Sequence, residues 1–256
     1  MKNQEKQGKK LVLKNRRTWH YAIIAILVLT SIAFFGSLKN GFVTWDDNLY
    51  VTENALIRDL SFGGIKAIFT TFYGGNYHPL TALSNAVEYR LFGLNPTAFH
   101  AGNLLLHLIN VFLVFQFIQL LTKRLEASAL VALFFAIHPM HVESVAWVSE
   151  RKDLLYTMFF LGALISYLRY LQSVHQKKFF VSTVLFSLLS LLSKSAAVIL
   201  PVVLLLLDYY SRRPIRANLL VEKIPFLVFS LLFGIVALKS QSSAGAMNSL
   251  DPYSFV

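Results

Sequence analysis

Long uncharged apolar blocks restrict the folds open to this chain more than any other feature. A bilayer core about 30 Å thick needs roughly 20 consecutive apolar helical residues, and in lipid every backbone polar group must be bonded internally. Some of the blocks are short, but we predict a membrane span in each of seven: Tyr21–Ser37, Phe99–Thr122, Ala129–Val148, Leu154–Leu171, Phe179–Ser193, Ser195–Leu207 and Lys223–Leu238. The sequence therefore predicts an all-α fold, a polytopic transmembrane bundle of about seven helices.

Three of these spans leave alternatives open. The third contains Pro139, and the two spans on either side of Lys194 could form a broken or re-entrant hairpin. The composition supports the membrane class as a whole, because only 14% of the 256 residues are charged, against roughly a quarter in soluble domains. The chain contains no cysteine, which excludes disulfides and thiol chemistry.

Basic residues gather in the N-terminal segment and in alternate turns, which together hold 16 of the 24 lysines and arginines. The positive-inside rule makes this side cytoplasmic, with the N-terminus on it. The net charge of +11 then reflects topology and affinity for anionic lipids, not nucleic-acid binding. We predict a multi-pass protein of the bacterial inner membrane whose partner is the lipid bilayer and not nucleic acid.

The same topology divides the chain into three parts. Residues 1–20 form a basic cytoplasmic N-terminus, and residues 21–238 form the membrane domain. Residues 239–256 form an outer tail that reads as truncated. The first apolar run could be a cleavable signal peptide, but no small-residue cleavage site follows it, which favours a retained anchor.

An outer loop, residues 38–99, separates the first two spans and is too long for a simple connector. Pro79 suits the first turn of a helix. Apolar residues then recur at helical spacing from Leu80 to Leu91. This pattern predicts an amphipathic helix that lies along the membrane surface.

Polar side chains form a stripe on one face of the second span: His100, Asn103, His107 and Asn110. One interpretation is hydrogen bonding between helices that fixes their packing. The alternative is that His100 and Asn103, near the outer end, border a substrate cavity. Similarly, Lys194 ends a polar stripe on the fifth span, where it either anchors the turn or meets a lipid phosphate.

Residues 138–153 place ionisable groups of both signs between two apolar runs, which is the strongest functional signal in the chain. Arg151 and Lys152 could hold a phosphate, with Glu143 and Asp153 to orient them. His138 and His141 suggest a metal site only weakly, because no third ligand stands at a diagnostic spacing. The alternative is an interfacial network of ion pairs with a structural role alone.

Asp46 and Asp47 follow Trp45 in the outer loop. A carboxylate at an apolar boundary can serve as a general base, because partial desolvation raises its pKa. The alternative is ordinary turn chemistry, for which Asp-Asp-Asn is also suited.

Several of these segments together resemble the membrane portion of the TMTC-like family, the transmembrane and tetratricopeptide-repeat proteins, and their bacterial relatives. The similar segments are Phe42–Tyr50, Tyr77–Thr81, Leu91–Pro96 through His100, Asn103 and His107, His138–Trp147 through Arg151 and Asp153, Leu192–Lys194 and Leu206–Asp208. The chain lacks the tetratricopeptide repeats of that family and has fewer spans than its members, which indicates a fragment or a truncated product.

The resemblance implies a GT-C type glycosyltransferase that moves a sugar from a polyprenyl-phosphate donor to a protein or glycan acceptor on the outer face. It implies a catalytic base at Asp46 or Asp47, and contacts from Arg151 and Lys194 to the donor phosphate. We predict no cofactor, with a divalent metal left open. The rival interpretations are a lipid-sugar transporter, an assembly scaffold and an inactive fragment. The full set of predicted substrate-binding residues is His78, His100, Asn103, His138, His141, Glu143, Arg151, Asp153 and Lys194.

Overall fold

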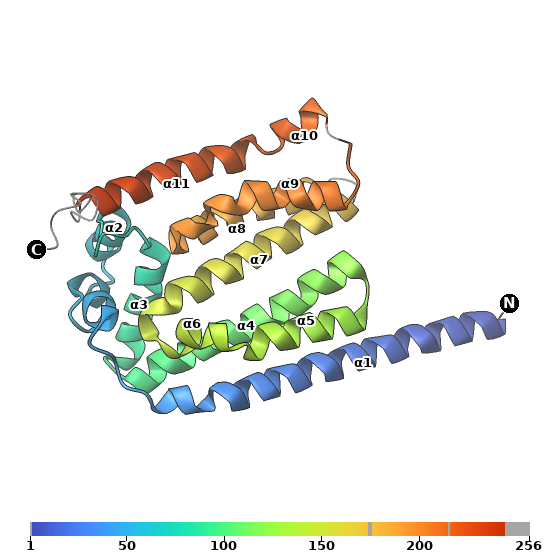
Figure 1. The fold of residues 1–256 in the computed structure, drawn as a ribbon, viewed down its shortest axis with the longest axis horizontal. Coiled ribbons are helices and arrows are strands. Elements are labelled where there is room, and N and C mark those ends of the chain that lie inside the picture. The colour runs from blue at the N-terminus through green and yellow to red at the C-terminus, as the bar shows by residue number, and fades with distance from the viewer. Residues whose placement is uncertain (1, 174–175, 215, 244–256) are drawn as a thin grey trace, which may run out of the picture.

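The computed structural model describes residues 2–173, 176–214 and 216–243, and within them the fold is all-α, as predicted. Each of the seven predicted spans overlaps a helix, although the third continues past the end of its helix, and these helices alternate in direction between the two ends of the molecule (Figure 1). They are α1 (Lys2–Phe34), α4 (Pro96–Thr122), α5 (Leu125–Ile137), α7 (Arg151–Gln172), α8 (Lys177–Ser193), α9 (Leu200–Tyr210) and α11 (Ile224–Ser243).

Four segments are long and apolar enough to cross a membrane: Thr18–Lys39, Pro96–Thr122, Val148–Gln172 and Leu219–Ser243. A fifth is formed if α5 is joined with the short η4 (Pro139–His141) and α6 (Val142–Ala146), which meet it at a bend of 53°. The remaining two helices, α8 and α9, are shorter. The protein is therefore a multi-pass membrane protein, and its described residues contain four or five helices long and apolar enough to span a bilayer, fewer than the seven predicted.

The bend after α5 follows from Pro139. Proline lacks a backbone N–H and disfavours helical geometry in the residue before it. Accordingly, His138 ends α5 with an extended backbone, and its side chain accepts a hydrogen bond from the N–H of Met140 at 3.2 Å. The third predicted span is thus a broken one.

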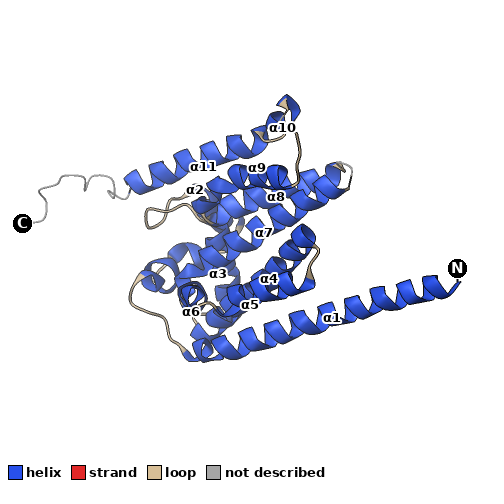
Figure 2. Ribbon diagram, turned by 45° about the vertical axis from the view of Figure 1, so that its right-hand side comes forward, coloured by secondary structure: helices blue, strands red, loops and turns tan. Residues whose placement is uncertain are grey.

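One end of the molecule collects the connecting segments, and we call it the loop end (Figure 1). The outer loop supplies its elements: η1 (Phe35–Lys39), η2 (Asn48–Thr52), η3 (Ala55–Arg58), α2 (Phe62–Thr70) and α3 (Pro79–Phe92). The helix α6, η5 (Val148–Glu150) and η6 (Ser195–Ile199) complete it. Figure 2 shows the same gathering of short helices and loops from a second direction.

The opposite end holds the N-terminus, the basic turns and the short α10 (Ala217–Val221). The charge asymmetry predicted from the sequence thus exists in space. Residues 244–256, which make up most of the predicted outer tail and include Asp251, lie outside the described part of the chain.

The helix α3 has its polar side inward. Thr81 and Asn85 are buried against the protein, whereas Val87 and Leu91 are exposed, at 45% and 67% of their surface. In water this arrangement would be unfavourable, but it suits a helix whose outer side meets lipid. The amphipathic helix predicted from Pro79 is therefore present, and its orientation is compatible with the predicted place at the membrane surface.

Hydrogen bonds between helices account for most of the polar stripe on α4. Asn103 donates to the carbonyl of Trp147 at 3.0 Å, and Asn110 donates to that of Leu154 at 2.9 Å. His107 lies 2.9 Å from the carbonyl of Ala136, near the end of α5, where backbone carbonyls lack a helical partner. These bonds confirm the packing interpretation for the three residues.

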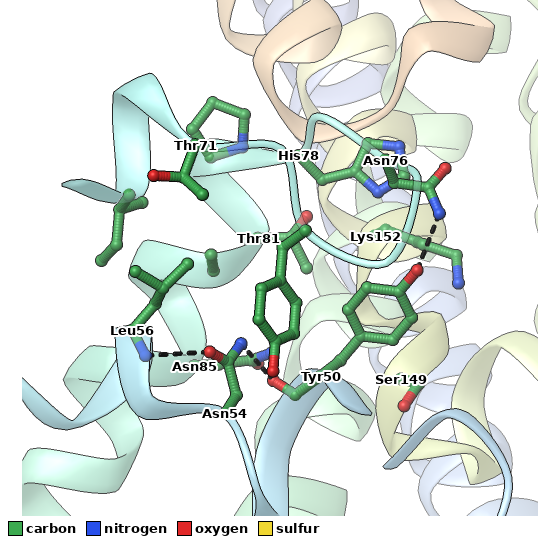
Figure 3. A pocket seen from close by; sticks show the side chains of 14 residues that line it. Tyr50, Asn54, Leu56, Thr71, Asn76, His78, Thr81, Asn85, Ser149 and Lys152 are labelled. Atoms are coloured by element: carbon green, nitrogen blue, oxygen red, sulfur yellow. Dashed lines mark hydrogen bonds between the residues drawn. The ribbon is translucent and has the colours of Figure 1, made fainter. Parts of the chain in front are cut away.

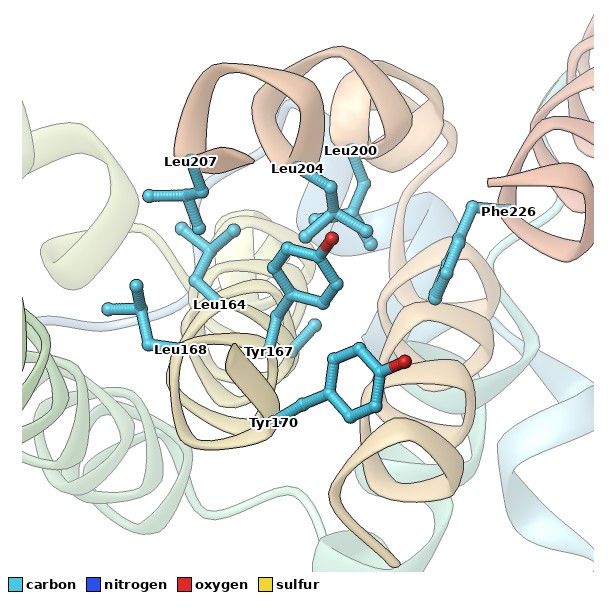
Figure 4. Packing of buried hydrophobic residues seen from close by; sticks show 9 residues of the cluster. Leu164, Tyr167, Leu168, Tyr170, Leu200, Leu204, Leu207 and Phe226 are labelled. Atoms are coloured by element: carbon cyan, nitrogen blue, oxygen red, sulfur yellow. The ribbon is translucent and has the colours of Figure 1, made fainter. Parts of the chain in front are cut away.

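A buried core joins α7, α9 and α11 (Figure 4). Its members include Leu164, Tyr167, Leu204 and Phe226. Beside this core, a polar network is centred on the Asp208 carboxylate. The Lys223 ammonium group lies 2.6 Å and the Arg213 guanidinium group 2.9 Å from this carboxylate, which also accepts a hydrogen bond from the Tyr167 hydroxyl. Arg213 and Lys223 are among the 16 basic residues that the positive-inside rule counts, but Lys223 is only 1% exposed and has a structural role as well.

Candidate active site

An open cleft of about 440 Å³ lies at the loop end, and we call it the loop-end cleft. Segments far apart in the sequence converge on it: the outer loop, the beginnings of α3 and α7, η6 and α11. Its lining residues are Asp46, Tyr50, Asn76, His78, Lys152, Lys194, Ser195, Ala196, Val198, Gly234, Ala237 and Gln241. Three of them, Asp46, His78 and Lys194, were predicted as site residues from the sequence.

Two lysines supply the positive charge of the cleft. Lys152 pairs with Glu150 at 2.8 Å, and its ammonium group lies 5.3 Å from the centre of the Tyr50 ring. Lys194 pairs with Asp153 and lies 3.9 Å from Glu150. Because an ammonium group has three donors, these pairs leave each lysine able to bind a further anion. Asp153 does not line the cleft itself but holds Lys194 at it.

The two adjacent aspartates have different environments. Asp46 is partly exposed and lines the cleft. Asp47 is 1% exposed and accepts hydrogen bonds from the backbone N–H groups of Val43 and Ser149, each at 3.0 Å. It also accepts from the Ser149 hydroxyl at 2.5 Å. Asp46 thus lines the cleft, whereas Asp47 is buried and joins the outer loop to Ser149.

His78 stands at the beginning of α3 and borders the cleft. Burial lowers the pKa of His78 to about 4, and the positive charges of Lys152 and Lys194 act in the same direction. Its imidazole is therefore neutral at physiological pH. In that state it offers one donor and one acceptor to a ligand without adding charge.

Arg151 does not reach the cleft. It is 2% exposed and forms an ion pair with Glu88 of α3. Its other nitrogens donate to Asn103 and to the carbonyl of Phe99, both at 2.9 Å. The guanidinium group is thus occupied by partners within the protein, whereas Lys152, the next residue, lines the cleft.

The Arg151 pair occupies a tight space against α4. A Cβ atom at Gly102 would lie 2.4 Å from an oxygen of Glu88 and 2.8 Å from a nitrogen of Arg151. Glycine at this position therefore lets the ion pair approach the α4 backbone. Burial raises the pKa of Glu88 while Arg151 acts against that rise, so the carboxylate depends on its partner for its charge.

The remaining predicted residues lie apart from the cleft. His138 and Glu143 are exposed near the α5 bend, and His141 packs on Phe135, with ring centres 4.4 Å apart. His100 is buried, 3.4 Å from the Gly41 carbonyl. In the part of the chain that the structure describes, no three histidine or acidic side chains come close enough to hold a metal ion.

Tyr50 and Asn76 belong to the site but were not singled out from the sequence. The Tyr50 hydroxyl accepts from the Asn76 side chain at 2.7 Å, which joins η2 to the loop before α3. Burial raises the pKa of Tyr50, so its hydroxyl keeps its proton. Tyr50 ends a segment that resembles the family, whereas the signal for Asn76 was its presence in a long loop.

A second, smaller pocket adjoins the cleft, and we call it the side pocket (Figure 3). It shares Tyr50, Asn76, His78 and Lys152 with the cleft and extends between η3, α2 and α3. Its volume is about 40 Å³, far smaller than that of the cleft. The site therefore has an open charged compartment and a small neutral one.

Comparison with known proteins gives several curated relatives. Human Protein O-mannosyl-transferase TMTC1 is 32% identical over 191 residues, which make up 68% of this chain and 21% of that protein. Human TMTC3, of the same description, is 31% identical over 157 residues, 57% of this chain and 17% of the relative. For human TMTC4 the identity is 36% over 168 residues, with coverages of 56% and 22%.

The chain thus spans about a fifth of the length of these relatives. No family model matches it. No solved structure matches it either.

Proposed function

Because this chain is a TMTC-like membrane protein, we propose that it contains the donor site and the catalytic base of a membrane glycosyltransferase. The donor in this proposal is a polyprenyl-phosphate sugar, and the acceptor is a hydroxyl group of a protein or glycan. The names of the relatives, protein O-mannosyl-transferases, suggest mannose as the sugar and protein as the acceptor. The proposed class is GT-C.

The observation that supports this function best is the meeting of Asp46 with Lys152 and Lys194 around one cleft. A glycosyl transfer from a phosphate donor needs a base for the acceptor and cations for the leaving group. The cleft supplies both, from segments about 100 and 150 residues apart in the chain. Its volume of about 440 Å³ is within the usual range for small-molecule sites.

The chemistry follows from these positions. Asp46 accepts the proton of the acceptor hydroxyl as its oxygen forms a bond to the anomeric carbon of the sugar. The bond from that carbon to the phosphate oxygen breaks, and its electron pair leaves with the polyprenyl phosphate. Lys152 and Lys194 stabilise the negative charge that develops on the leaving phosphate.

The wall formed by α11 provides a path for the lipid part of the donor. Gly234 and Ala237 of this helix line the cleft, and a Cβ atom at Gly234 would meet no other atom within 4 Å. The same helix exposes Leu231, Ile235 and Leu238. A polyprenyl chain can therefore lie against α11 in the bilayer while its phosphate reaches the lysines.

The proposed orientation places the loop end outside and the basic end in the cytoplasm. A bacterial source and an inner-membrane location remain sequence-based predictions. The polar stripe of α4 does not favour the transporter interpretation, because three of its members are bonded to neighbouring backbone.

Replacement of a cleft lysine tests the donor site. We expect Lys194→Met and Lys152→Met each to weaken binding of a fluorescent short-chain polyprenyl phosphate about tenfold, because a charge-assisted contact is lost. Titration of the purified protein in lipid nanodiscs measures this change. Lys239→Met, an exposed lysine of α11 outside the cleft lining, serves as the matched control and should leave binding unchanged.

The phosphate-free polyprenol distinguishes recognition of the head group from recognition of the tail. Both lysine variants should bind it as the unmodified protein does. Equal affinity of all variants for the polyprenyl phosphate would exclude the cleft as the donor site.

A further inference from the structure

The side pocket contains a buried hydrogen-bond acceptor without a partner. Asn85 of α3 is 2% exposed and lines the pocket, and its side-chain oxygen has no hydrogen-bond partner in the structure. A buried acceptor left unpaired is unfavourable, so a group that donates a hydrogen bond is expected to meet it. This group must come from outside the described chain.

The neighbouring polar groups are already used within the protein. The Asn54 side chain accepts from the N–H of Leu56 at 2.9 Å and donates to the carbonyl of Tyr50 at 3.2 Å. The Thr81 hydroxyl donates to the carbonyl of Ser193 at 3.0 Å. Asn85, labelled in Figure 3, is thus the buried amide of this pocket whose oxygen has no partner among the described residues.

The volume of the pocket and its apolar lining limit the size and the polarity of the ligand. A volume of about 40 Å³ admits one or a few water-sized groups but not a sugar ring. Leu56, Ile68 and Ala82 form an apolar part of the lining. A ligand that fills the pocket therefore has one small apolar part and one donor.

Charge excludes a cationic ligand. Lys152 stands at the boundary with the cleft, where it would repel an ammonium group. The neutral His78 at the same boundary adds no negative charge to offset this repulsion. A neutral alcohol carries no positive charge and combines a hydrogen-bond donor with a small apolar part, as the pocket requires.

We propose that the side pocket is a subsite for a hydroxymethyl group, whose hydroxyl donates to the Asn85 oxygen and whose CH₂ lies against Leu56 and Ile68. This inference rests on the proposed glycosyltransferase function and adds a recognition element to it. Two sources present this chemistry beside the cleft. One is the exocyclic hydroxymethyl of the sugar, and the other is a serine side chain of the acceptor.

Binding experiments with paired probes test the subsite and identify the source. Saturation-transfer NMR in nanodiscs compares a methyl hexoside with its 6-deoxy counterpart, and a serine peptide with the matching alanine peptide. We expect the hydroxymethyl-bearing member of one pair to bind about tenfold more tightly. The pair that shows this preference identifies the source.

Asn85→Leu, of nearly the same size, should abolish the preference without loss of thermal stability, because it removes an unpaired polar group. Asn85→Asp keeps an acceptor oxygen and should retain the preference. Val87→Ala, on the exposed side of the same helix, controls for changes in α3.

Absence of a preference in both pairs would show that the pocket holds water only and would overturn the subsite. A preference that survives in Asn85→Leu would also overturn it. These measurements need neither sugar transfer nor a donor phosphate. Their result can therefore be interpreted even if the test of donor binding fails. The subsite and the proposed function can therefore fail separately.

Discussion

Asp46→Asn is expected to reduce sugar transfer by roughly 10²–10⁴-fold, the usual contribution of a general base. Asparagine has nearly the same shape but cannot accept the proton of the acceptor hydroxyl. Asp46 makes none of the buried hydrogen bonds that Asp47 makes, so the thermal stability should stay unchanged. The measurement is transfer of a labelled sugar from its polyprenyl phosphate to a serine- or threonine-containing peptide.

Asp47→Asn is the matched control and should show the opposite pattern. Its carboxylate accepts from the N–H groups of both Val43 and Ser149, whereas an asparagine would turn its own NH₂ toward one of these donors. One buried donor then lacks an acceptor, at a cost of about 1–3 kcal/mol. We expect lower stability with transfer per folded molecule retained. A stable Asp47→Asn protein without activity would instead identify Asp47 as the base.

Arg151→Leu is expected to destabilise the protein by about 3–5 kcal/mol, because Glu88, whose side chain is only 12% exposed, would lose the partner on which its charge depends. Against a usual total stability of about 5–15 kcal/mol, this loss would unfold a large part of the population. Thermal denaturation and limited proteolysis in nanodiscs would measure it.

The double variant Arg151→Leu with Glu88→Leu separates the two roles considered for Arg151. Removing both charges should restore much of the stability, since replacing a buried ion pair by apolar side chains is often tolerated. An Arg151→Leu protein that folds normally and loses only polyprenyl-phosphate binding would support the donor contact that the family resemblance implies.

The helices and their approximate limits could be predicted because hydrophobic length alone determines where a chain can cross a bilayer. The inward direction of His107 and Asn110 was predictable for a related reason, since polar groups in lipid must find protein partners. Asp46 was predicted only as one of a pair. Its separation from Asp47 depends on Ser149, a contact across 102 residues that no local pattern encodes.

The role of Arg151 could not be predicted for a similar reason. Arg151 and Lys152 are adjacent in sequence, but successive residues of a helix point about 100° apart. Which of them faces the cleft is decided by the docking of α3, which brings Glu88 to Arg151. The positive-inside rule, in turn, counted Lys223 without its partner Asp208, because the rule considers charges and not their contacts.

The inward polar side of α3 has a consequence for the depth in the membrane at which a substrate binds. A helix with lipid on its outer side and polar contacts on its inner side lies in the plane of the membrane interface. It therefore sets the depth of the neighbouring segments relative to the head-group layer. His78, at the beginning of this helix, borders the loop-end cleft. The polyprenyl-phosphate donor that we propose would then reach the cleft by lateral diffusion within its own leaflet.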